Sequence, residues 1–288
     1  MSLPPPVRAP VPAEVDLDYR MEDFEPEADS GRDSVFYHQR TDQAVVDEVI
    51  SSPPGRVLDV ACGSGDLAAR LGGAGWEAWG LEASNHMLGL GRWQGFDRQA
   101  VLARGIAEAL PFREGSFDKV VCKGSLDHFA DRAAFMKEAA RVLRPDGRLV
   151  IALANFDALS RRLGRTMHAL ARLLGTPGPG GRPYWQPPVT HTVWGDLTYV
   201  RSLGGQRFAL QRCYGVSLLH HFRPWRLIVN RLPPRLGWAL MAVLDGIARR
   251  WPATGDMIVS VWRPRRPGPG ASGGPAPDNA IDRKATPE

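Results

Sequence analysis

Val57-Leu58-Asp59-Val60-Ala61-Cys62-Gly63-Ser64-Gly65-Asp66-Leu67-Ala68 is the stretch of sequence that decides the fold. It predicts a buried strand, a glycine turn and the start of a helix, the unit with which open α/β sheets bind nucleotides at a strand's carboxyl end. Gly63 and Gly65 can adopt a positive φ and have no Cβ, so a ligand can lie directly against the backbone. A lone Gly-x-Gly also fits an ordinary tight turn, so residues further along the chain must choose between the two.

A carboxylate follows the next predicted strand at the sequence spacing of a ribose-binding acid. The strand over 76–81 ends before Glu82, 17 residues after Gly65, which is typical of an acid that accepts hydrogen bonds from a ribose diol. Gly63, Gly65 and Ala68 also match the G-x-G-x-x-A pattern of dinucleotide sites. Asp59 argues against that alternative, because a pyrophosphate beside it would meet a like charge. We expect Asp59 to accept N–H bonds from the turn.

Three more motifs follow in order: Ala107-Glu108-Ala109-Leu110-Pro111-Phe112, Phe117-Asp118 and Leu143-Arg144-Pro145-Asp146-Gly147. With the glycine turn, they make residues 35–155 resemble the class I S-adenosylmethionine (SAM)-dependent methyltransferases of the small-molecule type. Two positions depart from the family's pattern. Ile106 stands where the family usually has an Asp that contacts adenine, and Ala61 replaces its first motif glycine.

The resemblance implies SAM as the cofactor and names residues that would bind it. Together with the reasoning from the turn, it gives a candidate cofactor set of Asp59, Gly63, Gly65, Glu82, Met87, Ile106, Ala107, Glu108 and Lys123. Within this set, Met87 would pack on the adenine, and the three residues from Ile106 to Glu108 would line it. Lys123 begins the loop after the fourth strand.

The catalytic and acceptor residues are expected at the same edge of the sheet. Asp127 and His128 follow the fourth strand, and His128 is the candidate general base because imidazole titrates near neutral pH. Tyr184, Trp185 and His191 are the candidate acceptor-lining residues. The adjacent pair His220-His221 is the obvious place to look for a metal, but adjacent side chains point apart, so we expect no metal site.

Composition limits the class of protein. The chain has 288 residues, 43% of them apolar, and three cysteines without C-x-x-C spacing. Neither a secretory leader nor an apolar stretch of 18 residues is evident, so we expect a cytoplasmic protein without disulfides or structural zinc.

The expected fold is α/β: a Rossmann-like, doubly wound, mainly parallel sheet with an antiparallel edge strand, followed by a mainly helical C-terminal insertion or lid. We predict a flexible tail over 1–30, a SAM-binding core over 31–155, a lid with the final strands over 156–263 and a disordered tail over 264–288. The core helices are expected at 35–51, 84–94 and 131–143. The last two strands are expected at 206–213 and 256–262, with a long insertion over 216–252 between them.

Three functions remain open from the sequence. The favoured one is methyl transfer to a small-molecule or lipid-like acceptor, with aromatic residues after position 155 forming a deep pocket. The alternatives are a nucleic-acid methyltransferase, which we disfavour because no nucleic-acid-binding module or catalytic N/D-P-P-Y/F motif is evident, and a non-catalytic SAM-binding protein.

The region from Leu159 to Arg250 is strongly basic, with fourteen arginines, no lysine and two aspartates. A basic amphipathic helix is expected over 159–175. Its apolar residues (Leu163, Met167, Leu170, Leu173 and Leu174) and its arginines (Arg161, Arg162, Arg165 and Arg172) fit either a lid packed on the core or a helix lying on an anionic membrane.

Overall fold

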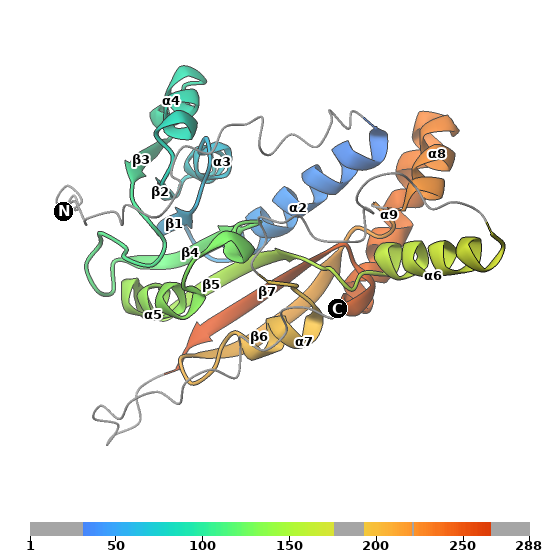
Figure 1. The fold of residues 1–288 in the computed structure, drawn as a ribbon. Coiled ribbons are helices and arrows are strands. Elements are labelled where there is room, and N and C mark those ends of the chain that lie inside the picture. The colour runs from blue at the N-terminus through green and yellow to red at the C-terminus, as the bar shows by residue number, and fades with distance from the viewer. Residues whose placement is uncertain (1–30, 176–192, 221, 266–288) are drawn as a thin grey trace.

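The computed structural model describes residues 31–175, 193–220 and 222–265, and it contains a seven-stranded sheet in the order β3-β2-β1-β4-β5-β7-β6 (Figure 1). Strands β1 to β5 are parallel, whereas β7 is antiparallel to both β5 and β6. The antiparallel pair therefore forms one edge of the sheet. This confirms the Rossmann-like fold expected from the alternating strand and helix patterns.

The elements follow the chain in alternation up to β5 and then become mainly helical. Their bounds are α2 (Arg32–Ile50), β1 (Arg56–Val60), α3 (Asp66–Gly73), β2 (Glu77–Glu82), α4 (Asn85–Trp93), η1 (Phe96–Arg98), β3 (Ala100–Arg104), β4 (Phe117–Lys123), η2 (Leu126–His128), α5 (Arg132–Val142), β5 (Leu143–Ala154), α6 (Leu159–Leu173), α7 (Leu197–Ser202), β6 (Phe208–Val216), α8 (Arg223–Arg231), α9 (Pro234–Arg250), η3 (Pro252–Thr254) and β7 (Met257–Pro264).

Helices cover both faces of the sheet, which is why its central strands read as continuous apolar runs. On one face, α2 and α3 pack over the strands through a cluster that includes Val45, Leu67 and Val150. On the other face, α5 and α7 pack through a cluster that includes Phe135 and Val200. The two layers lie above and below the sheet in Figure 1. The sheet is thereby fixed as a rigid platform for a site at its carboxyl edge.

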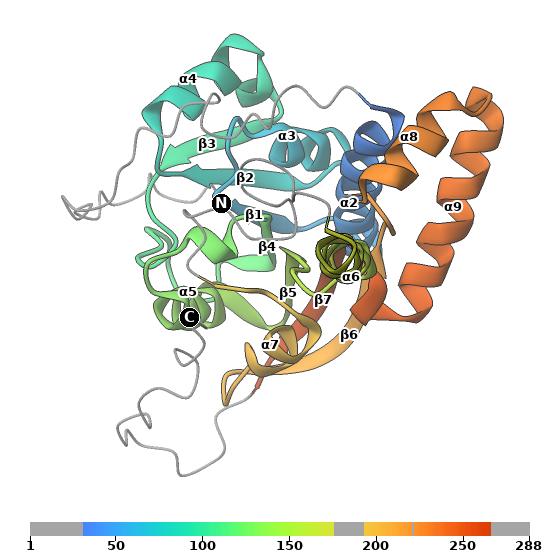
Figure 2. The ribbon, with the colours of Figure 1, turned by 45° about the vertical axis from the view of Figure 1, so that its right-hand side comes forward.

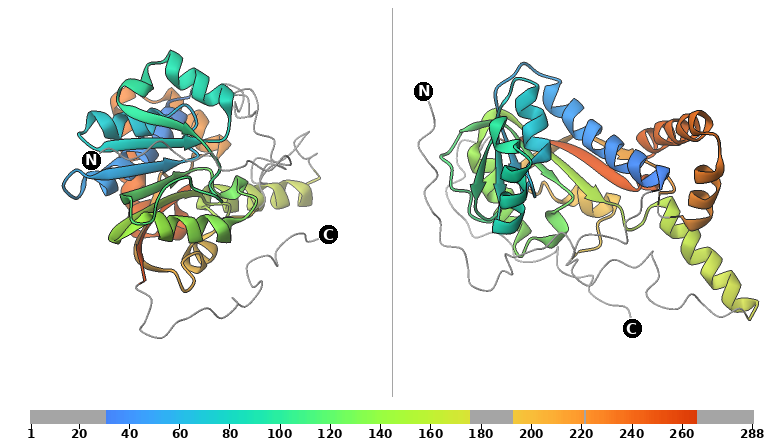
Figure 3. Two further views of the ribbon diagram at one scale, coloured as in Figure 1. Left: turned by 90° about the vertical axis from the view of Figure 1, so that its left-hand side faces the viewer. Right: turned by 90° about the horizontal axis from the view of Figure 1, so that it is seen from above.

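The helical segments that follow β5 and precede β7 both lie at the carboxyl edge of the sheet. Ala154 at the end of β5 pairs with Met257 at the start of β7, so α6, which follows β5, and the α8–α9 hairpin, which precedes β7, begin side by side. Figures 2 and 3 show α6, α8 and α9 beyond the end of the sheet, with α6 projecting from the body. The carboxyl edge therefore carries the mainly helical C-terminal segments expected from the sequence.

Local differences from the sequence-based expectation have structural causes. Strand β5 begins at Leu143 rather than 148, because Leu143 pairs with Phe117 before a shift in register. Helix α2 begins at Arg32, three residues early, and β7 extends to Pro264. The predicted tail over 1–30 and nearly all of the tail over 264–288 lie outside the described residues.

Across the described parts of the chain, no helix combines the length and the apolar character needed to cross a bilayer.

Candidate SAM and acceptor site

The turn after β1 has the backbone conformation that its glycines predict. Gly63 and Gly65 have φ of 58° and 89°, and Gly65 caps the start of α3. Ala61, which replaces a glycine of the family motif, also has a positive φ of 56°. That conformation costs an L-residue about 1–2 kcal/mol. The turn is therefore held in its shape by the surrounding contacts.

A Cβ at Gly65 would meet the protein before it met a ligand. It would lie 2.6 Å from Cδ2 of Leu102 on β3, which is closer than carbon atoms can approach. At Gly63, the nearest atom would be the Cε of Met87 at 3.3 Å. From the sequence, both glycines are expected to allow a ligand to approach the backbone closely. The structure adds a second reason at Gly65, which is close packing of the turn against β3.

Glu82 organises the turn through backbone hydrogen bonds. Its Oε2 accepts the N–H of Gly63 at 2.9 Å, and its Oε1 accepts the N–H groups of Ala83 and Ser84 at 2.9 and 3.0 Å. The side chain of Ser84 then accepts the N–H of Met87 and begins α4. One carboxylate therefore joins the first and second strand-end loops and fixes their relative position.

Asp59 does not stabilise the turn in the way the sequence suggested. The Gly63 N–H donates to Glu82, and the Gly65 N–H donates to the carbonyl oxygen of Cys62. Asp59 is instead buried at the end of β1. Burial raises its pKa to about 7; Lys123 opposes this shift and the Glu82 carboxylate adds to it.

The charges around the turn distinguish between possible ligands. Asp59, Glu82 and Asp66 lie close enough for the latter two to raise the pKa of the first. Glu82 and Asp66, together with the partly protonated Asp59, disfavour a pyrophosphate, but they suit a ligand with cationic groups and a ribose diol. SAM has an ammonium, a sulfonium and such a diol. The residues present therefore fit SAM better than a nicotinamide dinucleotide.

The predicted adenine-lining residues divide into two kinds. Ile106 and Ala107 are buried and apolar, which suits a wall of a base-binding site. Glu108 has a structural role, because its Oε1 accepts the N–H groups of Ala130 and Asp131 at 3.0 and 3.3 Å. It thereby ties the loop after β3 to the loop before α5.

Lys123 is held by an ion pair that the sequence did not reveal. Its Nζ lies 2.5 Å from Oδ1 of Asp42 on α2, whose other oxygen contacts Arg70 of α3 at 3.1 Å. The ammonium group therefore ties the end of β4 to α2 and lies near Asp59. The Lys123 ammonium group could therefore influence a bound ligand through its charge as well as by direct contact.

The predicted catalytic residue lies in a short helical turn after β4. His128 ends η2, is partly buried and donates its N–H to the Ser125 carbonyl oxygen at 3.0 Å. Asp127 beside it is buried. The candidate acceptor residues Tyr184, Trp185 and His191 lie outside the described residues.

A group of titratable side chains at the start of α2 was missed by the sequence analysis. The ring of Tyr37 stacks on His220, with centroids 4.3 Å apart and planes 8° apart. Asp256 accepts the backbone N–H of His220 at 2.9 Å, and Asp33 lies 3.6 Å from its Nδ1. Residues 37 and 220 belong to no shared motif, so only the tertiary fold brings them together.

The electrostatics of this group favour the protonated form of the Tyr37 hydroxyl and the neutral form of the neighbouring His38 imidazole. Burial raises the pKa of Tyr37 above its usual range, and Asp256 adds to the shift. Burial lowers the pKa of His38, as does the nearby His220, whereas Asp42 opposes the change. Burial therefore favours the uncharged form of both side chains.

The aromatic residues that were expected to form a deep pocket lie in separate parts of the described structure. Phe208 belongs to the main core, and Trp225 and Trp238 pack around Phe36 beneath the hairpin. Trp194 and Trp251 are exposed. These aromatic residues lie in one region of the sequence, but they pack in separate clusters or are exposed.

Comparison with known proteins shows the family. The family described as "Methyltransferase domain" matches residues 58–151. A demethylmenaquinone methyltransferase from Renibacterium salmoninarum is 35% identical over 216 residues, which cover 67% of this chain and 89% of that protein. The chain belongs to the class I SAM-dependent methyltransferases. SAM is accordingly the cofactor of this methyltransferase.

Other matches cover less of their proteins or show only the fold. A ubiquinone/menaquinone biosynthesis C-methyltransferase from Geotalea uraniireducens is 36% identical over 104 residues, 34% of this methyltransferase and 44% of that protein. The matched region thus spans less than half of that relative. Magnesium protoporphyrin IX methyltransferase from Synechocystis, solved with bound SAH, has a TM-score of 0.51 at 19% identity, over 81% of this chain and 85% of that one. The [4+2]-cyclase SpnF has a TM-score of 0.52 at 20% identity, with coverages of 81% and 85%.

Proposed function

We propose that this methyltransferase transfers a methyl group to a small, lipid-like acceptor, with a quinone-type ring as the first candidate. The observation that carries the proposal is the match to a demethylmenaquinone methyltransferase over 89% of that protein's length. A match of that extent reaches beyond residues 58–151, the part of the chain matched by the shared domain. The resemblance therefore extends into the part of the chain that would select the acceptor.

In the proposed cofactor site, Gly63 and Gly65 shape the backbone beneath SAM, and Glu82 faces its ribose. Glu82 already accepts three backbone N–H bonds, which leave about one of its roughly four acceptor positions for a hydroxyl. Asp59 would interact with the cationic part of the ligand. Met87, close to the turn, would pack on the adenine, with Ile106 and Ala107 behind it.

In the proposed reaction, bound SAM supplies the electrophilic methyl group, so the protein's task is to position the acceptor and handle its proton. His128 is the proposed general base, because it follows β4 at the carboxyl edge of the sheet. Helices α2 and α6 lie beside the carboxyl edge of the sheet and would limit the access of water to the reacting groups.

The test uses the full chain with methyl-labelled SAM and two acceptors, a short-chain demethylated menaquinol and bulk tRNA. The proposal predicts label in the menaquinol product and none in tRNA. Label in tRNA alone would overturn it in favour of a nucleic-acid substrate. SAM binding by calorimetry without transfer to either acceptor would contradict the quinone-type ring and leave the cofactor site intact. Glu82→Ala, which should weaken SAM binding, is the control for cofactor-dependent labelling.

A further inference from the structure

The outer face of the α8–α9 hairpin exposes large apolar side chains. On α9, Leu236 (53% exposed), Val243 (62%) and Ile247 follow one another at helical spacing. On α8, Leu227 and Ile228 are exposed. Exposed apolar stripes on neighbouring helices are uncommon on proteins that act alone in water. This face is therefore a candidate surface for binding a partner.

The charges on the hairpin are of one sign. Residues 222–251 contain six arginines, no lysine and a single acid, Asp245. Asp245 is buried and contacts Arg40 at 2.8 Å and Arg249 at 3.2 Å, so it adds no negative charge to the outer face. An apolar stripe flanked only by arginines is complementary to an anionic, partly apolar surface.

The fold of the hairpin does not depend on this outer face. Its inner side packs Trp225, Val229 and Met241 against Phe36 of α2. Arg32 donates hydrogen bonds to the carbonyl oxygens of Val229 and Leu232. Side chains on the outer face can therefore be changed without removing the contacts that attach the hairpin.

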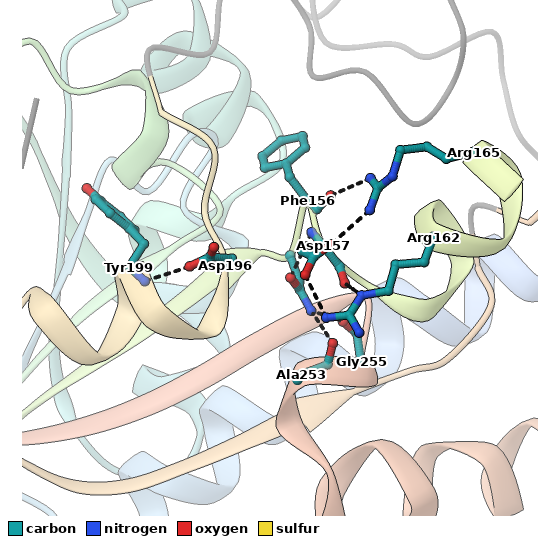
Figure 4. Close-up of polar contacts among 9 residues, drawn as sticks. Phe156, Asp157, Arg162, Arg165, Asp196, Tyr199, Ala253 and Gly255 are labelled. Carbon is teal, nitrogen blue, oxygen red and sulfur yellow. Dashed lines mark hydrogen bonds and ion pairs between the residues drawn. The ribbon is translucent and has the colours of Figure 1, made fainter. Parts of the chain in front are cut away.

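Helix α6 adds an apolar end and less outward positive charge than its four arginines suggest. Arg161 is only 6% exposed and lies over the ring of Phe156, while Arg162 and Arg165 both pair with Asp157 (Figure 4). Of the four arginines that the sequence assigned to the basic side of this helix, Arg161 is therefore buried and cannot contact a surface. Its last turns nevertheless expose Leu170, Leu173 and Leu174, the second of them 84% exposed, so a packed lid describes only the first turns.

We propose that the α8–α9 hairpin and the end of α6 form a surface that docks on an anionic lipid bilayer. Leucine, valine and isoleucine side chains would enter the boundary between headgroups and acyl chains, while the arginines would contact the lipid phosphates. A second copy of the chain is a poorer occupant, because a symmetric contact would bring two arginine-rich faces together. The helices lie on the surface and do not cross it.

The position of this surface connects it with the reaction. Helix α6 and the hairpin leave the sheet where β5 ends and β7 begins, the edge that carries the proposed acceptor site. In Figure 1 the three helices lie together at the end of the molecule opposite α4 and β3. Docking by this end would allow an acceptor dissolved in the bilayer to reach the site. Only this functional benefit rests on the proposed lipid-like acceptor.

The docking test measures co-flotation of the full chain with vesicles, without SAM or acceptor. Vesicles of phosphatidylglycerol and phosphatidylcholine should bind the protein at low salt, and pure phosphatidylcholine vesicles should bind it at least about tenfold more weakly. Leu236→Ser with Val243→Ser should weaken binding about tenfold. Replacing Arg223, Arg231, Arg235 and Arg250 by Gln should weaken it about a hundredfold or more.

Matched controls lie at the other end of the molecule. Trp93→Ser with Val101→Ser removes exposed apolar side chains from α4 and β3, and replacing Arg92, Arg98, Arg113 and Lys137 by Gln removes four exposed charges. Both controls should bind vesicles like the wild type. Absence of binding to anionic vesicles, or equal losses in the control variants, would overturn the docking surface.

Failure of docking and failure of the proposed function are distinguishable. The variants of the hairpin should methylate a water-soluble acceptor at the wild-type rate, because none of the replaced residues belongs to the proposed site. Vesicle binding without quinol methylation would contradict the proposed acceptor alone. Quinol methylation without vesicle binding would contradict docking alone.

Discussion

The carboxylate of Glu82 accepts the backbone N–H of Gly63 at 2.9 Å, so a side chain at the end of β2 holds the turn at the end of β1. Glu82→Ala should weaken SAM binding about ten- to a hundredfold, because it removes a charge-assisted acceptor worth about 1.5–3 kcal/mol and releases the turn. Calorimetric titration measures the effect. Glu77→Ala, at the exposed start of the same strand, should leave SAM affinity unchanged; similar losses in both variants would contradict a specific role for Glu82.

Gly65 offers a test of why a glycine is needed in the turn. Gly65→Ala should destabilise the protein by about 2–4 kcal/mol, because it combines a positive φ with a collision against Leu102. Gly115→Ala is the matched control, since Gly115 has φ of 63° and no atom within 4 Å of the added Cβ. It should cost only about 1–2 kcal/mol in urea unfolding.

A double variant separates the two contributions at Gly65. In the background of Leu102→Ala, the added cost of Gly65→Ala should fall toward that of Gly115→Ala, because the colliding methyl groups are gone. If the cost is undiminished, the collision with Leu102 is not its source.

Asp59 should make stability depend on pH in a direction unusual for a carboxylate. Its pKa is about 7 in the folded protein against 3.8 as the reference, so the folded state binds more protons between these values. Its contribution to stability therefore falls as pH rises from about 4 to about 7. Asp59→Asn removes this dependence.

The corresponding measurement is urea unfolding at two pH values. The stability of Asp59→Asn relative to the wild type should rise by about 2–4 kcal/mol between about pH 4.5 and pH 8. Asp97→Asn, at an exposed position, should show no such change. A difference that does not vary with pH would contradict the raised pKa.

The parts of the fold that the sequence predicts are those encoded locally. The apolar run before Gly63 and the spacing to Glu82 identify β1, its turn and β2, because burial on both faces of a parallel sheet requires continuous apolar strands. The start of β5 was misplaced because Pro145 and Gly147 suggest a loop. The pairing of Leu143 with Phe117 continues the strand through them.

The site contacts that the sequence could not predict join residues far apart in the chain. Tyr37 stacks on His220, and Lys123 pairs with Asp42, because α2 lies across the ends of β4 and β6. The structural role of Glu108 depends likewise on a loop more than twenty residues away. Such contacts follow from tertiary packing, and a pattern within one segment does not contain them.

The assignment of a general base can be tested through turnover and binding measured separately. His128→Gln should lower kcat about 10²- to 10⁴-fold on the true acceptor and leave the Kd for SAM unchanged, because a base acts on the acceptor proton and not on the cofactor. His86→Gln is the matched control, since His86 is exposed on α4. His38→Gln should have a smaller effect than His128→Gln. The reverse order would assign the proton to His38, whose pKa is lowered by burial, and wild-type kcat in both variants would show that positioning alone supports the reaction.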